Sequence, residues 1–361
     1  MAAKKNGEEP VPVVPAQPGR RVRARLTDIA RESGVSTATV DRVLNHRPGV
    51  RHATVLRVLR TASELDYLPE NASYCASATE PMKLIFLLPS NSNAFIRMLG
   101  DCVAVVQRIL EPFNIDCHVR FIAEFSPEIQ ADQLMKYGKK ADGIAFIALE
   151  HPLVRETVKK LVKQGKYVLT LVNDLSSSMR HAFVGLDNHA AGRTAGYLMG
   201  RLAGNREGKV VLIAGSLSYR AHHEREMGFQ QVQQEMFPRL HIVGLREGRE
   251  DAVRTYELTR DLLKQHSDLI GIYNIGGACD GVARAMKEAK VERKVIFIGH
   301  EITSMTRSYL IDGSMDAVIN QNAQVEIMNA VRIFTNLRDK KAALAGIEDV
   351  RIGVFVRENL P

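Results

Sequence analysis

Residues 33–51 read SGVSTATVDRVLNHRPGVR, and this stretch decides how the start of the chain folds. Gly34 provides a tight turn, and Ser36 can cap a helix over the following TATVDRVLN. Before the turn, Thr27 can cap a helix over DIARES. A third helix is expected over about residues 54–66, where apolar residues recur at helical spacing. This pattern predicts a helix-turn-helix unit, whose core includes Ala30, Val35, Val40, Leu44, Val55, Val58, Leu59, Ala62 and Leu65.

The net charge of the chain is concentrated in the same region. Residues 20–60 contain ten arginines, no lysine and three acidic residues, so they carry +7 of the formal net charge of +8. The remainder of the chain is close to neutral. A basic charge confined to one small module is typical of a polyanion-binding head on a neutral body. A three-helix packing unit with a solvated basic face is the alternative.

The second helix of this unit is expected to enter the major groove of double-stranded DNA with its N-terminal end. Thr37 and Ala38 then offer methyl or hydroxyl contacts to bases, and Arg42 can pair bidentately with guanine. Basic side chains nearby are better placed for phosphates, which position the protein without specifying sequence. The candidate DNA-binding residues are Thr27, Ser36, Thr37, Ala38, Thr39, Asp41, Arg42, Asn45, His46, Arg51 and Arg57.

Asp41 is an unexpected residue on this helix, because a carboxylate should repel DNA phosphates. It lies one turn beyond Thr37 and next to Arg42. Two interpretations stay open. Asp41 accepts a hydrogen bond from a cytosine amino group, or it orients a neighbouring arginine.

The string LTDIARESGVSTATVDRVLN, followed by RVLRTASELDYLPEN, resembles the head of LacI-type transcriptional repressors. Two features depart from that pattern. Asp41 stands where the family usually carries a small polar residue. The segment PENASYCASATEP, residues 69–81, lacks the leucine that the family usually wedges into the minor groove, and Tyr74, Cys75 and Ala76 are the candidates that remain. Because single heads bind poorly, a homodimer on a pseudo-palindromic operator is expected.

From Met82 onward, short β-rich runs alternate with amphipathic helices. This alternation predicts parallel sheets wound with βαβ units, and the number of strands is too large for one compact sheet. We therefore expect an all-α helix-turn-helix head joined to an α/β domain of two lobes with doubly wound parallel sheets. The expected division is a disordered tail (1–22), the head (23–68), a linker (69–81) and the two-lobed domain (82–361), with lobe 1 over about 82–187 and 322–345 and lobe 2 over about 188–321 and 346–361. The eleven expected strands are KLIFLLP, IDCHVRFI, DGIAFIAL, KYVLTLV, AFVGLD, KVVLIAG, HIVGL, LIGIYNI, KVIFIGH, DAVINQ and RIGVFV.

Polar residues follow several of these strands, at the edge where doubly wound lobes bind ligands. Their carboxylates and amides suit a hydroxyl-rich ligand. DGIAFIAL, VGLDNHAAGRTAGYLM and FIGHE also resemble the effector domain of the same family, which is similar to periplasmic sugar-binding proteins of the ribose type. That resemblance implies that Phe95 stacks on the ligand and that Arg225 and Asn274 hydrogen-bond it. The candidate effector-binding residues are Asn93, Phe95, Asn173, Asp187, Arg225, Asn274, Glu301 and Gln321.

The expected pocket differs from a ribose-type site in its charge. Glu301 stands where the family usually has Asp, and Val172-Asn173 stands where ribose-type sites have Asp-Arg. A second stacking aromatic is replaced near Arg249-Glu250. We therefore expect a small carbohydrate or polyol effector that carries a charge, or several hydroxyls beyond those of a simple hexose.

Other chemistry receives little support from the sequence. His222-His223-Glu224 lacks a further ligand at metal spacing and is expected in a solvated loop at the cleft mouth, so no metal is predicted. IGGACDG fits neither a dinucleotide-binding nor a Walker motif, and GxSxG is absent from the sequence, so we expect neither a cofactor nor an enzyme.

Two other classes of protein fit the sequence less well. A solute-binding protein of a transport system would need a signal peptide and no basic head, and an enzyme would need a catalytic motif. The scattered cysteines, without CxxC, suit a reducing cytoplasm, and no apolar run reaches the length of a membrane span. The expected protein is a cytoplasmic DNA-binding regulator.

Overall fold

The structure is a computed structural model that describes residues 24–44, 50, 52–65, 67, 81–90, 93–110, 113–122 and 126–361. The chain divides into two compact units, residues 1–76 and 77–361. The expected tail and nearly all of the expected linker lie outside the described residues. Each unit is described by itself.

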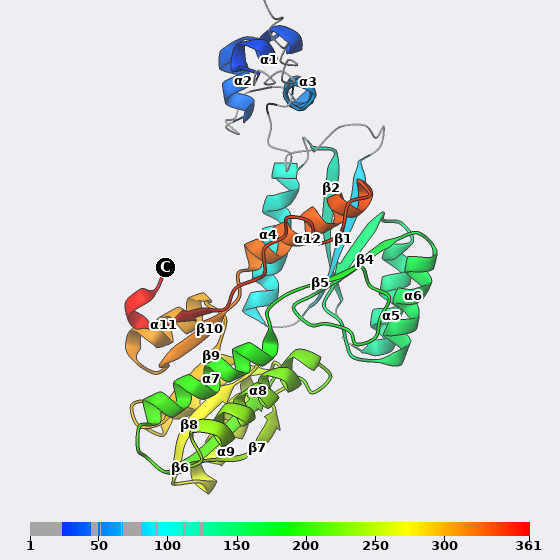
Figure 1. Cartoon of the computed structure of the whole chain (residues 1–361). Coiled ribbons are helices and arrows are strands. Elements are labelled where there is room, and N and C mark those ends of the chain that lie inside the picture. Colours follow the sequence, from blue (N-terminus) through cyan, green and yellow to red (C-terminus); the bar gives the residue numbers. More distant parts are fainter. Residues whose placement is uncertain are drawn as a thin grey trace, which may run out of the picture. The chain divides into compact units, whose positions relative to one another are not determined.

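The first unit contains three helices, α1 (Leu26–Ser33), α2 (Thr37–Leu44) and α3 (His52–Glu64) (Figure 1). Gly34 ends α1 with a φ of 64°, a left-handed conformation that costs glycine little. Ser36 caps α2 as expected, because its Oγ accepts a hydrogen bond from the backbone N–H of Thr39 at 3.2 Å. The helices pack around Ile29, Ala30, Val40, Val43, Val58 and Ala62, all buried.

The start of α1 differs from the sequence prediction. Thr27 does not cap this helix, which begins at Leu26 with Arg25 as its N-cap residue. The Asp28 carboxylate accepts a hydrogen bond from the Arg25 backbone N–H at 2.8 Å. The Asp28 carboxylate thus satisfies a backbone N–H at the start of the helix that would otherwise lack a partner. The Thr27 side chain is exposed and is not needed as a cap.

The second unit contains two sheets (Figure 1). The first has the strand order β2-β1-β3-β4-β5, with every pair parallel. The second has the order β11-β10-β9-β8-β6-β7. The strands are β1 (Met82–Pro89), β2 (Ile115–Ile122), β3 (Gly143–Phe146), β4 (Tyr167–Leu171), β5 (Ala182–Val184), β6 (Gly208–Ala214), β7 (Leu240–Glu247), β8 (Leu269–Asn274), β9 (Ile296–His300), β10 (Ala317–Asn320) and β11 (Gly353–Phe355).

Each expected strand run overlaps one of these strands, and one orientation needs correction. β11 runs antiparallel to β10, with Ile319 opposite Val354. It forms the edge of its sheet, where an antiparallel strand needs no crossover helix. The central strands are buried on both faces, as β3 and β9 illustrate, because helices cover both sides of a doubly wound sheet.

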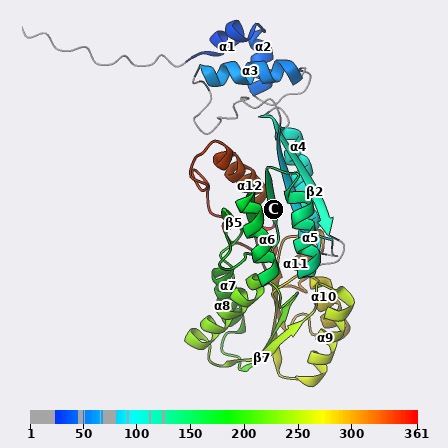
Figure 2. The same ribbon diagram turned by 90° about the vertical axis from the view of Figure 1, so that its right-hand side faces the viewer.

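Helices cover each sheet, and α7 and α8 lie on the opposite side of the six-stranded sheet from α9 and α10 (Figure 2). The helices of this unit are α4 (Ala94–Leu110), α5 (Pro127–Gly138), α6 (Pro152–Lys163), α7 (Asn188–Ala203), α8 (Arg220–Met236), α9 (Ala252–Gln265), α10 (Cys279–Glu288), α11 (Ser304–Asp312), α12 (Ala323–Arg338) and the 3-10 turn η3 (Arg357–Asn359). None of the helices in the described part of the chain has the length and apolar character needed to cross a membrane.

The chain passes between the two sheets three times. It leaves the first sheet after β5, returns after β10 to place α12 against α4, β4 and β5, and then crosses again to form β11. We call the five-stranded sheet with α4, α5, α6 and α12 lobe 1, and the six-stranded sheet with α7 to α11 lobe 2. Because several connections join the lobes, a change in the angle between them involves all these segments.

Candidate functional site

A cavity of about 200 Å³ lies between the two lobes. Its walls come from segments that follow β1, β4, β7, β8, β9 and β10, and from the start of α8. The carboxyl ends of both parallel sheets therefore face the same space, as expected for doubly wound lobes. A space of this size can hold one small molecule.

Most of the expected effector-binding residues meet in this cavity. The structure places Asn93, Phe95, Asn173, Arg225, Glu301 and Gln321 in its walls. They come from both lobes, so a molecule bound here contacts both.

Two expected residues, Asp187 and Asn274, are not among the described residues that line the cavity. Asp187 is exposed and caps α7, since its Oδ1 accepts a hydrogen bond from the Ala190 backbone N–H at 2.8 Å. Asn274 is fully buried, and its Nδ2 donates to the carbonyl oxygen of Gly277 at 2.7 Å. Both side chains hydrogen-bond nearby backbone groups, and their role in effector binding stays a prediction.

His222 is a cavity residue that the sequence did not predict. It was expected in a solvated loop, but it lies in the first turn of α8 and is 7% exposed. Burial, and then the nearby charge of Arg225, lowers the pKa of His222 to about 3. The imidazole of His222 is therefore neutral. His222 and Arg225 are three residues apart and share one face of a helix, and this spacing could have placed His222 in the site from the sequence.

Close helix packing positions Arg225. A Cβ at Gly228 would lie 2.1 Å from the carbonyl oxygen of His189, so α8 approaches α7 with no room for a side chain there. Arg225 Nε donates to Asn188 Oδ1 at 2.8 Å, and Nη1 donates to the carbonyl oxygen of Ile275 at 2.9 Å. These contacts fix the guanidinium and leave further N–H groups for a ligand.

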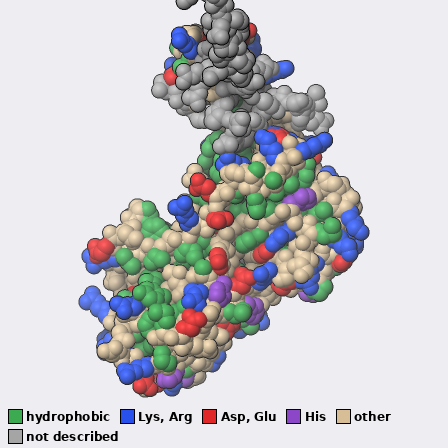
Figure 3. All heavy atoms as spheres, in the orientation of Figure 1, with side chains coloured by type: hydrophobic (Ala, Val, Ile, Leu, Met, Phe, Trp, Pro, Cys, Tyr) green, Lys and Arg blue, Asp and Glu red, His purple; other side chains and the backbone are tan. Residues whose placement is uncertain are grey.

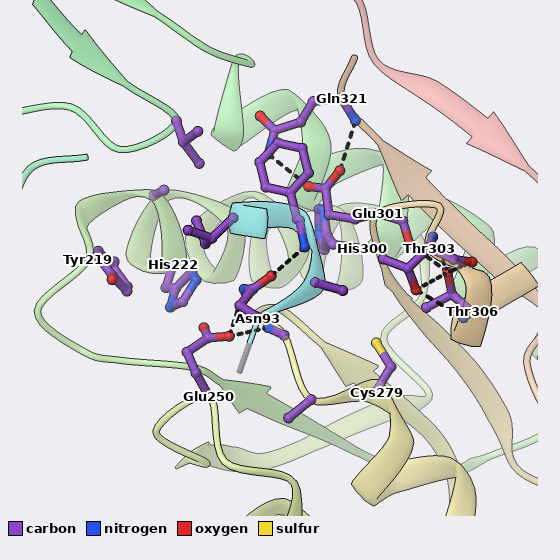
Figure 4. Close-up of a pocket in the computed structure, with 18 of the residues that line it drawn as sticks. Asn93, Tyr219, His222, Glu250, Cys279, His300, Glu301, Thr303, Thr306 and Gln321 are labelled. Carbon is purple, nitrogen blue, oxygen red and sulfur yellow. Dashed lines mark hydrogen bonds between the residues drawn. The ribbon is translucent and has the colours of Figure 1, made fainter. Parts of the chain in front are cut away.

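Glu301 is a buried carboxylate of the cavity wall (Figure 4). It adopts a left-handed φ of 67°, and its Oε1 accepts a hydrogen bond from Gln321 Nε2 at 2.7 Å. Burial raises the pKa of Glu301 to about 7, although the charge of Arg225 and the hydrogen bonds from Gln321 act in the opposite direction. Strained backbone of this kind is concentrated at ligand sites, and Val172, Glu250 and Ala278 in the same cavity also have positive φ.

Glu250 is a second buried carboxylate of the wall. Its Oε2 accepts hydrogen bonds from the Gly277 backbone N–H at 2.8 Å and from Asn93 Nδ2 at 2.9 Å (Figure 4). Burial raises the pKa of Glu250, and the hydrogen bonds from Gly277 and Asn93 partly offset that effect. The sequence contains one indication of this role, which is that a stacking aromatic of ribose-type sites is replaced near Glu250.

Polar contacts join the two lobes around the cavity. Asn173 of lobe 1 accepts a hydrogen bond from the Ala221 backbone N–H at 2.7 Å, and Arg220 of lobe 2 donates to Ser176 at 3.2 Å. Arg220 also lies 3.9 Å from Asp174. Figure 3 shows charged and histidine side chains gathered along this boundary. The lobes are thus held in one relative arrangement by direct hydrogen bonds.

Most of the described residues expected to bind DNA are accessible to solvent on and next to α2. Ser36, Thr37, Ala38 and Arg42 are exposed, and Thr39 and Asp41 are partly exposed, while Val40 and Val43 are buried against the other helices. Arg57 is exposed on α3. The candidate residues Asn45, His46 and Arg51 lie outside the described residues.

Comparison with known proteins agrees with both units. Residues 25–70 match the profile of bacterial regulatory proteins of the lacI family, and residues 84–342 match that of a periplasmic binding protein domain. The second match covers more than half of the chain, so the chain belongs to the proteins with a periplasmic binding protein domain, and its first unit carries a lacI-type match. The resemblance and the fold class expected from the sequence are therefore confirmed.

Several curated relatives of this chain are named as regulators. Catabolite control protein A of Priestia megaterium is 25% identical over 206 residues, which cover 56% of this chain and 58% of that protein. The HTH-type transcriptional regulator MalR of Streptococcus pneumoniae is 27% identical over 212 residues, with 57% and 61% covered. The HTH-type transcriptional repressor PurR of Vibrio vulnificus is 26% identical over 214 residues, with 59% and 61% covered. The matches span about three fifths of each relative.

Solved structures resemble the second unit of this chain. The glucose-galactose binding protein GanP of Geobacillus stearothermophilus aligns with a TM-score of 0.71 at 23% identity, over 78% of this chain and 99% of that one. A solute-binding protein of Burkholderia graminis in complex with D-arabinose aligns with a TM-score of 0.71 at 19% identity, over 78% and 98%. At these identities the likeness establishes the fold alone.

Proposed function

We propose that this protein is a transcriptional regulator that binds a pseudo-palindromic operator, and that a small carbohydrate or polyol between the lobes controls this binding. The observation that carries the proposal is a cavity with charged and amide side chains in its wall at the carboxyl ends of two sheets, in a chain that also has a helix-turn-helix unit with an exposed polar face on α2. The protein is a binding protein and not an enzyme. Acting on operator DNA, it works in the cytoplasm.

Control requires two arrangements of the lobes with different affinities for the effector. Asn93 and Phe95 reach the cavity from lobe 1, and Arg225, Glu250 and Glu301 reach it from lobe 2. A ligand that contacts both groups favours one lobe angle over the other. This bias reaches the head through residues 69–81, and whether it releases or strengthens operator binding is decided by experiment.

We further propose that the protein acts as a homodimer, because two heads are needed for the two half-sites of a palindrome. Exposed apolar side chains on neighbouring elements of lobe 1 support this proposal. Val105 and Ile109 on α4 and Phe121 on β2 are 52%, 44% and 49% exposed. Surfaces of this kind are common at contacts between protein subunits.

A mobility-shift assay tests the function. Duplexes selected from a random pseudo-palindromic pool should be shifted by the wild-type protein, and at least one member of a sugar panel should change that shift. Arg42→Ala should relax base preference, and Arg57→Ala should weaken binding to all sequences and reduce the salt slope by about 1. The exposed Arg201 in lobe 2 provides the control variant Arg201→Ala, which should behave as wild type. No shift at any salt concentration would refute the proposal.

A further inference from the structure

The cavity contains more buried acidic than buried basic side chains. Glu250 and Glu301 line it and are each 8% exposed, whereas Arg225 is the buried cation among the described lining residues. The exposed Arg97 and the half-buried Asp280 also line the cavity, so the acidic side chains remain in excess. Glu326, in the first turn of α12, is 0% exposed, and its charge interacts with that of Glu301.

The carboxylate of Glu250 occupies a space that three glycines leave open. A Cβ at Gly215 would lie 1.5 Å from Glu250 Oε1, and a Cβ at Gly276 would lie 2.7 Å from the same atom. A Cβ at Gly277 would lie 2.2 Å from Glu250 Oε2. Gly276 and Gly277 belong to the IGGACDG segment, which fits no nucleotide-binding motif. Its glycines instead make room for a carboxylate in the cavity wall.

The wall around Glu301 has unused hydrogen-bond acceptors. Gln321 directs its amide nitrogen to Glu301, and its Oε1 is buried without a hydrogen-bond partner. Both carboxylate oxygens of Glu326, which lies behind the lining residues and interacts with the charge of Glu301, are buried without a partner as well. Buried polar atoms in folded proteins are normally satisfied, so the acceptor of Gln321 favours a molecule that brings hydrogen-bond donors.

We propose that the effector is an amino-substituted carbohydrate or polyol, whose protonated amine is held by the carboxylates of Glu250 and Glu301. An ammonium group supplies three donors and one positive charge, which match the acceptors and the acidic excess of the wall. This inference rests on the proposed function, because it takes the cavity to be the effector site.

Two other ligand classes fit these observations less well. A sugar acid would pair with Arg225 but would bring a further negative charge beside two buried carboxylates. A neutral sugar would supply donors but would bring no positive charge to offset the acidic excess of the wall. Burial raises the pKa of both Glu250 and Glu301. A bound cation would lower both pKa values again.

Matched pairs of ligands test the inference at pH 7. Calorimetry compares glucosamine with glucose, galactosamine with galactose, mannosamine with mannose, and 1-amino-1-deoxysorbitol with sorbitol, and includes glucuronate as an acid. The wild-type protein should bind at least one amine at least about tenfold more tightly than its deaminated partner. Glu250→Gln and Glu301→Gln should each bring that ratio close to one. The exposed Glu257 on α9 provides the matched control Glu257→Gln, which should keep the ratio.

Both cavity variants replace a buried charge by an isosteric amide, and circular dichroism should show that they remain folded. Equal or tighter binding of the neutral or acidic partners, or failure of every amine to bind, would overturn the inference. In that case, operator binding that still responds to a neutral or acidic sugar would leave the proposed function standing. If the wild-type protein instead bound no operator DNA at all, the proposed function itself would be refuted.

Discussion

Asn93 Nδ2 lies 2.9 Å from Glu250 Oε2, and this hydrogen bond joins the loop after β1 in lobe 1 to the loop after β7 in lobe 2. One contact therefore orients a cavity carboxylate and also holds the two lobes together. A ligand that changes the charge or position of Glu250 acts directly on the arrangement of the lobes.

Asn93→Ala should weaken effector binding by about tenfold or more. A hydrogen bond to a charged group contributes roughly 1.5–3 kcal/mol, and the variant leaves one donor fewer on a buried carboxylate. Calorimetry with the ligand identified from the panel measures the change. Asn329→Ala is the control. Asn329 Nδ2 donates a hydrogen bond to the Glu348 carbonyl oxygen, and Asn329 is not among the residues that line the cavity. An unchanged affinity in Asn93→Ala would show that the bond does not support the bound state.

Glu301 should make the ligand-free protein less stable as the pH rises. Its pKa in the folded protein is about 7, above the ordinary value of 4.5. Between these values the folded state binds more protons than the unfolded state, so the free energy of unfolding falls as the pH rises, by about 3 kcal/mol for this group. Denaturant titrations of wild type and Glu301→Gln at pH 5 and pH 8 isolate this contribution from those of other groups. The variant should lose less stability across the interval, and parallel losses in both proteins would contradict the assignment.

Gly228→Ala should reduce both stability and effector affinity. The added methyl group meets the backbone of α7 at His189, so α8 must move and carry Arg225 with it. Overpacking of this kind typically costs about 1–3 kcal/mol. Thermal unfolding and calorimetry measure the two effects. A matched control is Gln231→Ala, on the exposed face of the same helix, which should change neither by much. A stable Gly228→Ala protein with normal affinity would show that the helices can separate without cost.

Asp41→Ser should relax base preference at one position of the operator half-site. The side chain lies on α2 between the exposed Arg42 and the buried Val40, close to the helix end expected in the major groove. Selection from a randomised operator pool compares the wild type with the variant. If the variant instead binds all sequences more tightly by the same factor, Asp41 acts only by repelling phosphates, and neither a cytosine contact nor an oriented arginine explains it.

The fold could be predicted from local patterns because burial is periodic in sequence. The eleven strands coincide with apolar runs, and Gly34 and Ser36 mark the turn before α2. The orientation of β11 could not be predicted, since it depends on the crossing that follows α12 and not on the residues of the strand.

The site was harder to predict from single residues. Asp187 and Glu301 both follow a strand, and only the spatial arrangement separates a helix cap from a cavity carboxylate. His222 was missed because α8 begins after Tyr219 without a side-chain cap, which leaves no sequence signal for the helix start. Glu326 looks like an ordinary acidic residue of a first helical turn, and its burial arises from packing between elements distant in sequence.

The glycines around Glu250 also constrain how this regulator can evolve. A larger residue at position 215, 276 or 277 would displace the carboxylate, and a smaller residue at position 250 would leave an empty space with nothing to fill it. The four positions are therefore epistatic, and no single substitution among them exchanges one fully packed arrangement for another. A descendant of this protein that answers to a different effector would be expected to change Glu250 together with at least one of these glycines.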